Sequence, residues 1–252
     1  MQFLGGERRL VSLGNPFDGA AAAEPPSLDG IDMLESLSWE ERDRVAALCR
    51  WQRFRAGETV LDQDGDGCEV CFVVQGAVRI VSYSYSGREV SFDDVPAGGV
   101  VGEMAAIDGQ PRSASVEALE PGTLIAFLSG GAFLSLATGH PQLALALMRR
   151  LAGMVRRCTE RIVDLSTLGA ANRVQSEILR LAVVQGGERG NTAVIRPIPV
   201  HADLAARVGT TRETVARVLG DMARDGFLER RSGEMVVRDL ARLRALVEEV
   251  RG

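Results

Sequence analysis

Residues 101–118 of the chain read VGEMAAIDGQPRSASVEA, and this stretch decides how the rest of the sequence is interpreted. An apolar run leads into Gly102 and Glu103, and the next residues are long enough for one helical turn. Glycine lets the backbone approach a bulky anion, and the N–H groups that open a helix carry partial positive charge. After a polar turn, Arg112 offers a planar fork to a phosphate and Ser113 offers a hydroxyl donor.

Glu103 does not suit a bare phosphate, because like charges repel. Its carboxylate suits a ligand that also donates a hydroxyl hydrogen bond, as the 2′-OH of a ribose does. An ordinary surface loop in which Glu103 pairs with Arg112 is the alternative interpretation. The Gly-Glu pair and the Arg-Ser pair occur together between two predicted strands. This combination favours a site for a sugar-phosphate ligand.

The Gly-Glu-Met-Ala sequence, the polar turn and the Arg-Ser-Ala sequence resemble the phosphate-binding cassette of cyclic-nucleotide-binding domains. This version is similar to the cassette of bacterial cyclic-AMP receptor proteins in the CRP/FNR superfamily. The resemblance implies that Gly102 and Glu103 take the backbone and ribose contacts. It also implies that Arg112 and Ser113 hold the cyclic phosphate. The neighbouring residues assigned to the same site are Met104, Ala105 and Ala114.

The composition suits a chain of two modest domains without a membrane span. A chain of 252 residues is long enough to form a buried apolar core in each of two domains. No apolar run approaches the roughly 20 residues that span a bilayer, and the start lacks a signal-peptide apolar segment. Four irregularly spaced cysteines do not indicate a disulfide framework. We therefore expect a cytoplasmic protein with no membrane partner.

The net charge of −5 conceals an asymmetry along the chain. Residues 1–170 carry 15 arginines against 23 acidic residues, a balance of −8. Residues 171–252 carry 14 arginines against 11 acidic residues, a balance of +3. A polyanionic partner is therefore expected in the C-terminal third.

The fold class expected from the patterns and the resemblance is α+β, in four parts. Residues 1–27 are predicted to be a flexible extension, because they are rich in glycine, proline and alanine. Residues 28–136 are expected to form a cyclic-nucleotide-binding β-roll, and residues 137–169 a dimerisation helix. Residues 170–252 are expected to form a winged helix-turn-helix domain that binds DNA.

Short strand patterns alternate with glycine-containing turns between Phe54 and Ser129, which is typical of a small antiparallel barrel or sandwich. Two short helices are expected before them, the second opened by a capping box of Ser38 and Glu41. The predicted strands are Glu58–Leu61, Val70–Gln75, Ala77–Tyr83, Glu89–Val95, Ser115–Ala118 and Gly122–Leu128.

The longest predicted helix runs over Pro141–Leu168. Val155 and Ile162 lie one residue off its main apolar seam and broaden it, so the helix has more apolar surface than one small domain covers. We therefore expect a homodimer, the role of the equivalent helix in the resembled family. The seam, spaced by fours and threes, consists of Leu147, Leu151, Met154, Cys158, Leu165 and Leu168.

Alignment with the resembled family places Cys158 and Thr159 at the base of the nucleotide, where cyclic-AMP receptors carry Thr-Ser. A hydroxyl can donate or accept, so these residues do not separate adenine from guanine. Cyclic AMP and cyclic GMP both stay open as the ligand. Binding is expected to bridge the roll and the helix and so to favour one arrangement of the DNA units.

Residues 201–219 have the layout of a helix-turn-helix, with Gly209 ending the first helix and Thr210 or Thr211 capping the second. This leaves Arg212, Glu213 and Arg217 facing outward near the end that contacts base edges. RETVARVL is similar to the recognition helix of cyclic-AMP receptors, which implies that these three residues read a TGTGA-type half-site. Thr211 is assigned to the same DNA surface. A protein-binding winged helix is the alternative.

Two further elements are expected beside this unit, a helix over Ala171–Gln185 and a strand over Val194–Ile198. A hairpin wing is expected around Arg230 and Arg231, whose side chains could meet phosphate.

No enzyme or metal site is predicted. The adjacent carboxylates Asp93 and Asp94 are interpreted as a solvated strand end, and His140 as a cap of the long helix. Neither histidine has a companion for zinc. The packing thiols are predicted to be Cys49, Cys68 and Cys71.

The sequence thus predicts a nucleotide-responsive transcription regulator whose resemblance implies RNA polymerase as a further partner. A family member that senses redox state or a gas, and a ligand-free constitutive DNA binder, remain alternatives. A regulatory subunit of an enzyme would leave the helix-turn-helix without a purpose.

Overall fold

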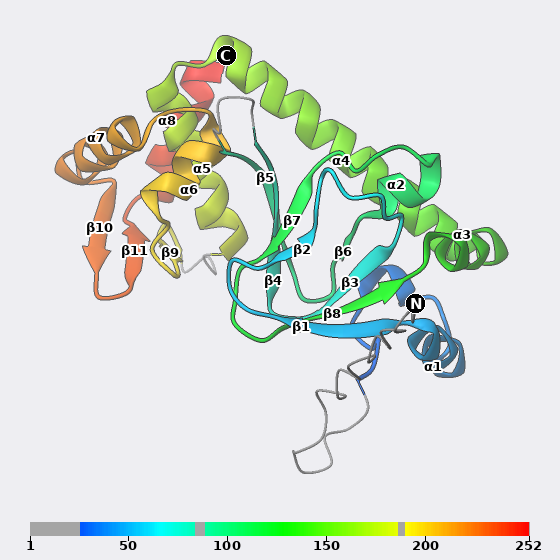
Figure 1. Ribbon diagram of the computed structural model, residues 1–252. Coiled ribbons are helices and arrows are strands. Elements are labelled where there is room, and N and C mark those ends of the chain that lie inside the picture. Colours follow the sequence, from blue (N-terminus) through cyan, green and yellow to red (C-terminus); the bar gives the residue numbers. More distant parts are fainter. Residues whose placement is uncertain (1–25, 84–88, 186–189, 252) are drawn as a thin grey trace, which may run out of the picture.

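A computed structural model describes residues 26–83, 89–185 and 190–251, so all but two residues of the predicted extension lie outside it. A β-roll occupies one part of the molecule, and a unit of helices with a small sheet occupies another (Figure 1). The long helix α4 (Pro141–Thr167) runs along the roll toward the second unit. The predicted α+β fold class is confirmed.

The roll consists of two four-stranded sheets whose strands pair antiparallel. The order in the first sheet is β1 (Arg50–Phe54), β8 (Thr123–Leu128), β3 (Val70–Gln75) and β6 (Val100–Val101). The order in the second is β2 (Thr59–Leu61), β7 (Ser115–Ala118), β4 (Ala77–Tyr83) and β5 (Glu89–Pro96).

The strand β3 is buried on both faces, which explains its continuous apolar sequence. Successive side chains of a strand point to opposite faces. Cys71 and Val73 therefore pack between the two sheets, whereas Val70 and Phe72 pack under the helices that cover the roll.

The covering helices are η1 (Asp32–Leu34), α1 (Trp39–Leu48) and α3 (Gly130–Gly139), together with the start of α4. The predicted capping box is confirmed: the Ser38 hydroxyl accepts from the Glu41 N–H at 3.3 Å, and the Glu41 carboxylate accepts from the Ser38 N–H at 2.8 Å. A further helical segment of the roll, α2 (Glu103–Asp108), lies between β6 and β7.

The helix α4 divides its apolar residues between two faces. Leu143 and Leu147 are buried against the roll. The exposed apolar residues Met148, Val155 and Ile162 recur at intervals of seven, with Cys158 and Leu165 three residues after two of them. An a/d heptad pattern of this kind is the seam of a coiled coil. The outward seam shares Cys158 and Leu165 with the predicted seam and includes Val155 and Ile162, whereas Leu147 and Leu168 are buried.

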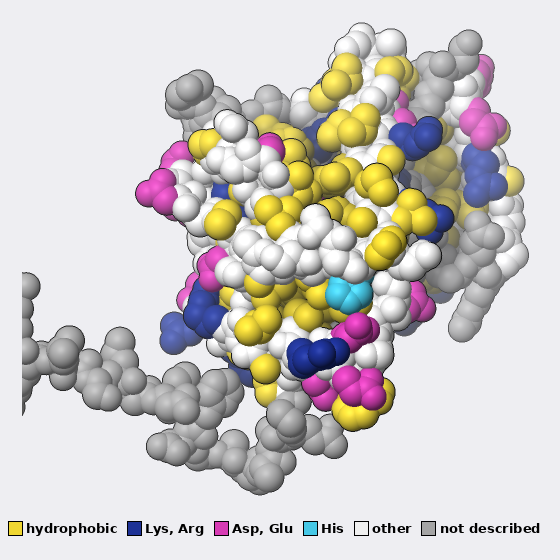
Figure 2. Space-filling view, turned by 90° about the vertical axis from the view of Figure 1, so that its right-hand side faces the viewer, with side chains coloured by type: hydrophobic (Ala, Val, Ile, Leu, Met, Phe, Trp, Pro, Cys, Tyr) yellow, Lys and Arg dark blue, Asp and Glu magenta, His cyan; other side chains and the backbone are white. Residues whose placement is uncertain are grey.

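The face at the end of the molecule formed by α3 and the start of α4 carries many hydrophobic side chains (Figure 2). Met104 and Ile107 of α2 are 42% and 39% exposed, and Met148 is 58% exposed. Apolar surface therefore continues from the seam of α4 onto the roll.

The C-terminal unit folds around its own apolar core. Its helices are α5 (Ala170–Gln185), α6 (His201–Val208), α7 (Arg212–Arg224) and α8 (Leu240–Arg251). Its sheet has the order β10 (Leu228–Arg231), β11 (Glu234–Val237) and β9 (Ala193–Ile195). The helices α6 and α7 with the β10–β11 hairpin form the predicted winged helix-turn-helix.

Three side-chain expectations are corrected. His140 occupies the N-cap position of α4 without capping it, because its ring nitrogens contact the Leu136 carbonyl and the Glu41 carboxylate. Cys68 is exposed rather than packed. Asp94 is not a solvated strand end, because two arginines bind it.

Candidate functional site

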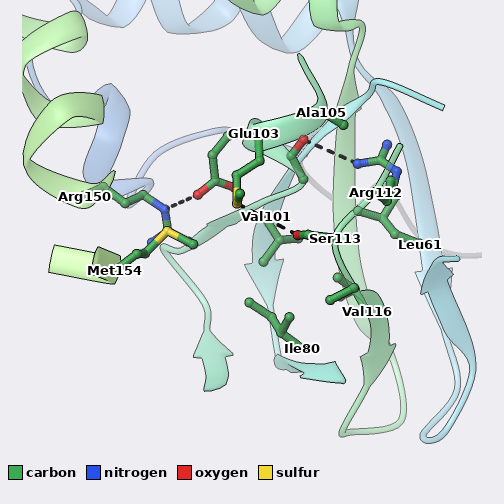
Figure 3. Close-up of a pocket in the computed structure, with 13 residues that line it drawn as sticks. Leu61, Ile80, Val101, Glu103, Ala105, Arg112, Ser113, Val116, Arg150 and Met154 are labelled. Atoms are coloured by element: carbon green, nitrogen blue, oxygen red, sulfur yellow. Dashed lines mark hydrogen bonds and ion pairs between the residues drawn. The ribbon is translucent and has the colours of Figure 1, made fainter. Parts of the chain in front are cut away.

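The cassette residues form one pocket between the roll and α4. The structure brings together seven of the predicted ligand residues: Gly102, Glu103, Met104, Ala105, Arg112, Ser113 and Ala114. The close-up places Arg112 on one side of this pocket and Arg150 of α4 on the other, with Ser113 between them (Figure 3). The remaining lining residues are Leu61, Ile80, Val101, Val116, Arg150 and Met154.

Gly102 makes the turn from β6 into α2 with a φ of 84°, a left-handed conformation that favours glycine. A Cβ atom at this position would lie 2.7 Å from the Arg112 guanidinium and 2.9 Å from the Glu69 carbonyl oxygen. The glycine is therefore required by both backbone conformation and close approach, and it lets Arg112 reach the turn.

Arg112 is only 7% exposed, and its guanidinium donates to two main-chain carbonyls. The acceptors are the Gly102 oxygen at 3.3 Å and the Glu69 oxygen at 2.9 Å. Among the described residues, no carboxylate forms an ion pair with Arg112. A buried cation without a counter-charge favours an anion in the adjacent pocket.

Glu103 is 2% exposed and does not pair with Arg112, which corrects the surface-loop alternative. Its carboxylate accepts from Nε of Arg150 at 2.7 Å, and Arg150 also donates to the Val100 carbonyl. Sequence reasoning missed Arg150, because 47 residues separate it from its partner and its own helix shows no motif around it.

The pocket meets α4 at Arg150 and Met154, not at Cys158 and Thr159. Cys158 is exposed, and the Thr159 hydroxyl donates to the Val155 carbonyl of its own helix at 3.0 Å. Both residues lie about one turn beyond Met154. Cys158 and Thr159 therefore do not line the pocket, and their contact with the base stays a prediction.

The second predicted surface lies on α7. The Thr211 hydroxyl caps this helix by accepting from the Thr214 N–H at 3.2 Å, and Gly209 has a φ of 65°. Arg212, Glu213 and Arg217 are all exposed, as expected from their spacing. Val215, Val218 and Leu219 fix the other face of α7 in the core of the unit.

Arg173 of α5 stabilises the turn between α6 and α7. Its guanidinium donates to the carbonyls of Val208 and Gly209 at the end of α6, and to the Leu168 carbonyl at the end of α4. One side chain thus joins the end of the long helix to the helix-turn-helix.

An ion-pair network, which we call the domain joint, connects the C-terminal unit to the roll. Arg79 of β4 pairs with Asp94 of β5 at 2.8 Å and with Asp203 of α6 at 2.6 Å. Arg207 of α6 pairs with Asp94 and lies 3.9 Å from Glu177 of α5. The side chains of Arg79 and Arg207 are 13% and 10% exposed, whereas those of Asp94 and Asp203 are 31% and 34% exposed, so the joint is only partly shielded from water.

The cysteines and acidic residues do not form a further site in the described part of the chain. Burial raises the pKa of the Cys49 and Cys71 thiols to about 12, which keeps both protonated at neutral pH. No group of three His, Cys, Asp or Glu residues that could hold a metal occurs among the described residues. No described helix has the length and apolarity required to cross a bilayer.

Two protein-family models match the chain, one over the roll that contains the pocket and one over the unit that contains α7. Residues 51–140 match the cyclic nucleotide-binding domain family, and residues 172–246 match the Crp-like helix-turn-helix domain family. A cyclic AMP receptor protein of Thermus thermophilus is 31% identical over 223 residues, which are 88% of this chain and 98% of that protein. A CRP-like cAMP-activated global transcriptional regulator of Mycobacterium tuberculosis is 26% identical over 81% of this chain and 92% of its own.

Solved structures share the whole architecture. A mutant of CooA from Carboxydothermus hydrogenoformans superposes with a TM-score of 0.74 at 22% identity, covering 85% of this chain and 95% of its own. A CRP/FNR-family transcriptional regulator from Thermus thermophilus gives a TM-score of 0.63 at 28% identity, covering 79% and 98%.

The roll, its pocket and the exposed recognition helix define a DNA-binding transcription regulator with a cyclic-nucleotide-binding domain, not an enzyme. The length and identity of the matches identify the family: the chain belongs to the CRP/FNR family of transcription regulators.

The domain joint predicts a difference between two arginine variants. Arg207→Ala removes a shielded partner of Asp94 and is expected to lower the free energy of unfolding by roughly 1–3 kcal/mol. Arg224→Ala is the control, because Arg224 pairs with Asp221 on the exposed surface of α7 and should change stability by less than about 0.5 kcal/mol. Denaturant unfolding measures both. An equal change in the free energy of unfolding in the two variants would contradict a stabilising role for the domain joint.

Proposed function

We propose that the protein is a homodimeric transcription regulator whose DNA binding responds to cyclic AMP or cyclic GMP. The observation that carries the proposal is the buried Arg112, which has main-chain acceptors but no ion-pair partner among the described residues. Ser113 and Glu103 beside it suit the phosphate and ribose of a cyclic nucleotide. The named role of the Thermus relative, a cyclic AMP receptor, supports this ligand class.

In this proposal the cyclic phosphate lies between Arg112 and Ser113, and the ribose 2′-OH donates to Glu103. Gly102, Met104, Ala105 and Ala114 line the same space. Cys158 and Thr159 do not line the pocket in this structure, and their contact with the base stays part of the proposal, from α4 of either copy of the dimer.

The pocket encloses about 60 Å³, enough for a few water molecules. Pockets for ligands of nucleotide size hold on the order of 300 Å³ or more. The proposal therefore includes a movement of side chains that line the pocket, among them Arg150 and Met154 of α4. A ligand that moves α4 favours one arrangement of the domains only by the difference in its affinity for the two.

The dimer is proposed to form along the outward seam of α4, whose apolar residues Val155 and Ile162 are 66% and 64% exposed. Two copies would present Arg212, Glu213 and Arg217 to half-sites of a TGTGA-like palindrome about 34 Å apart. Double-stranded DNA and RNA polymerase are the proposed macromolecular partners, in the cytoplasm. The domain limits of the chain are proposed to be residues 28–136, 137–169 and 170–252.

Replacing Arg112, the residue proposed to hold the cyclic phosphate, tests whether the pocket binds a cyclic nucleotide. Arg112→Ala should weaken binding of cyclic AMP and cyclic GMP at least about tenfold, because a charge-assisted hydrogen bond contributes roughly 1.5–3 kcal/mol. Calorimetry on the full chain measures this. Arg53→Ala, an exposed arginine of β1, is the control.

Arg112 also bonds two carbonyls, so Arg112→Lys is compared after thermal melting has shown that the variants fold. The lysine keeps the positive charge but lacks the planar guanidinium that can donate two parallel hydrogen bonds. If wild type binds neither nucleotide and Arg112→Ala leaves DNA binding unchanged, a sensor of redox state or a gas, or a constitutive DNA binder, replaces this proposal.

Replacing an exposed arginine of α7 tests whether this helix distinguishes the bases of a DNA site. Arg212→Ala should cost about 1–3 kcal/mol on the preferred site and relax the choice of base at one guanine. Binding to a panel of single-base variants measures the effect. Arg224→Ala, at the other end of α7, should leave base preference unchanged. A uniform loss on every sequence would show that Arg212 contacts only phosphate.

Cys158 lies in the outward seam of α4, so the proposed dimer interface can be tested by disulfide cross-linking. In a parallel dimer the d positions of the two copies face each other, so Cys158 should form a disulfide with Cys158 of the second copy under mild oxidation. Non-reducing electrophoresis should show a covalent dimer that disappears in Cys158→Ser. It should persist in Cys68→Ser, which removes the other exposed thiol. A cross-link that depends on Cys68 instead would contradict this seam.

A further inference from the structure

A second cavity lies between the roll and the C-terminal unit, where the end of α4 leads into α5 (Figure 1). Its walls are formed by β5 of the roll, by α4, and by α5, α6 and α8 of the C-terminal unit. Its volume is about 400 Å³, and sites for small molecules usually hold about 300–1,000 Å³. It shares no lining residue with the cassette pocket.

This interdomain cavity lies mostly outside the proposed dimer seam, which runs through Val155 and Ile162 of α4. One lining residue, Leu165, belongs to the seam. At 3.6 residues per turn, the other α4 residues that line the cavity point to the opposite side or the flank of the helix. These residues are Arg157, Glu160, Arg161 and Asp164.

Arg161 lines the interdomain cavity as a cation without a carboxylate partner among the described residues. One of its guanidinium nitrogens donates to the Ser91 carbonyl at 2.7 Å, and the group lies 5.6 Å from the centre of the Phe92 ring. Glu177 of the same cavity is bound by Arg180 through two hydrogen bonds. Burial lowers the pKa of the Arg161 guanidinium. An anion beside Arg161 would supply the missing counter-charge.

The other charged groups of the cavity limit how much negative charge a ligand can carry. The arginines that already bind carbonyls or carboxylates are Arg157, Arg173, Arg180 and Arg207. The acidic residues that line the cavity are Glu160, Asp164 and Glu177. Because like charges repel, these carboxylates disfavour a polyanion such as a nucleic acid or a polyphosphate. A single negative charge suits the cavity best.

The wall of the cavity on α5 and α8 is apolar and consists of Leu179, Val183, Val184 and Val247. Val183 and Val184 are 48% and 70% exposed, so a ligand that covers them removes apolar surface from water. The hydroxyl of Ser176 is buried without a hydrogen-bond partner among the described residues. A nucleotide would place the polar groups of its ribose and base against this wall, where they would lose hydrogen bonds to water without replacement.

We propose that the interdomain cavity binds a small molecule with one carboxylate and an apolar body, such as an aliphatic or an aryl-substituted carboxylic acid. Arg161 pairs with the carboxylate, and the Ser176 hydroxyl is available as a further donor. The apolar body lies against α5. The ligand contacts the roll and the C-terminal unit together, so it favours the arrangement in which the cavity is open. None of these residues belongs to the proposed nucleotide site, so the two proposals can fail separately.

Calorimetric titration of the full chain with octanoate tests the site, with octanol as the neutral ligand of the same carbon skeleton. Octanoate should bind at least about tenfold more tightly than octanol, because Arg161 recognises the carboxylate. Arg161→Gln should remove this difference. Arg156→Gln, at an exposed arginine of α4 that does not line the cavity, should retain it.

Arg161 also bonds the Ser91 carbonyl, so thermal melting first shows that Arg161→Gln folds. Val183→Glu is the second variant, at an exposed position where folding does not depend on the side chain. It places a carboxylate at the apolar wall and should weaken octanoate binding at least about tenfold.

Four results would overturn the proposal. Equal affinities for octanoate and octanol would show that no cation recognises the carboxylate. Octanoate binding that is unchanged in both Arg161→Gln and Val183→Glu would place the ligand elsewhere. Loss of octanoate binding in Arg112→Ala would place it in the cassette pocket. No binding of octanoate at millimolar concentration would show that the cavity does not take this class of ligand.

Discussion

The ion pair between Glu103 and Arg150 is the interaction on which the relation between roll and long helix depends. Glu103 is almost fully removed from water, and an unpaired carboxylate in that position would be costly. Arg150 supplies the counter-charge from α4 at 2.7 Å and binds the Val100 carbonyl beside it. The carboxylate that suits a ribose hydroxyl therefore also holds α4 in place. In the proposed function, a ligand that contacts Glu103 would compete with this ion pair to α4.

The strand β4 joins this pocket to the DNA-binding unit. Consecutive side chains of a strand point to opposite faces, and Ile80 lines the pocket while its neighbour Arg79 binds Asp94 and Asp203 in the domain joint. A small displacement of β4 therefore changes packing at the pocket and ion pairing at α6 together. Arg79 and Ile80 are adjacent in β4, and the pairing of β4 with β5 changes register directly after Ile80.

Local sequence signals predicted local structure well. The capping box at Ser38, the left-handed Gly209 and most strands of the roll depend on residues a few positions apart, and all appear in the structure. The strand β1 was missed, because its sequence RWQRF is mostly exposed and lacks an apolar alternation. The helix α3 was missed as well, since it opens with two glycines that ordinarily indicate a turn.

The contacts that the sequence could not predict join distant segments. No spacing rule connects Glu103 with Arg150, or Asp94 with Arg207. The predicted seam of α4 included Cys158 and Leu165, which are exposed, together with Leu147 and Leu168, which are buried. Periodicity shows that a helix has an apolar stripe but not which part of the stripe the rest of the chain covers. Alignment through the ends of α4 placed the predicted base contact at Cys158 and Thr159, about one turn beyond Met154, which lines the pocket.

The two faces of α4 link ligand binding to assembly. Met154 faces the pocket, and the next residue, Val155, belongs to the outward seam. Because the two residues are adjacent, a shift of the α4 backbone at Met154 would also move Val155 and the seam that a second copy would contact. Packed seams have discrete arrangements rather than continuous ones. In the proposed function, a nucleotide that enlarges this pocket by shifting the backbone of α4 would also change how the seam packs against a second copy.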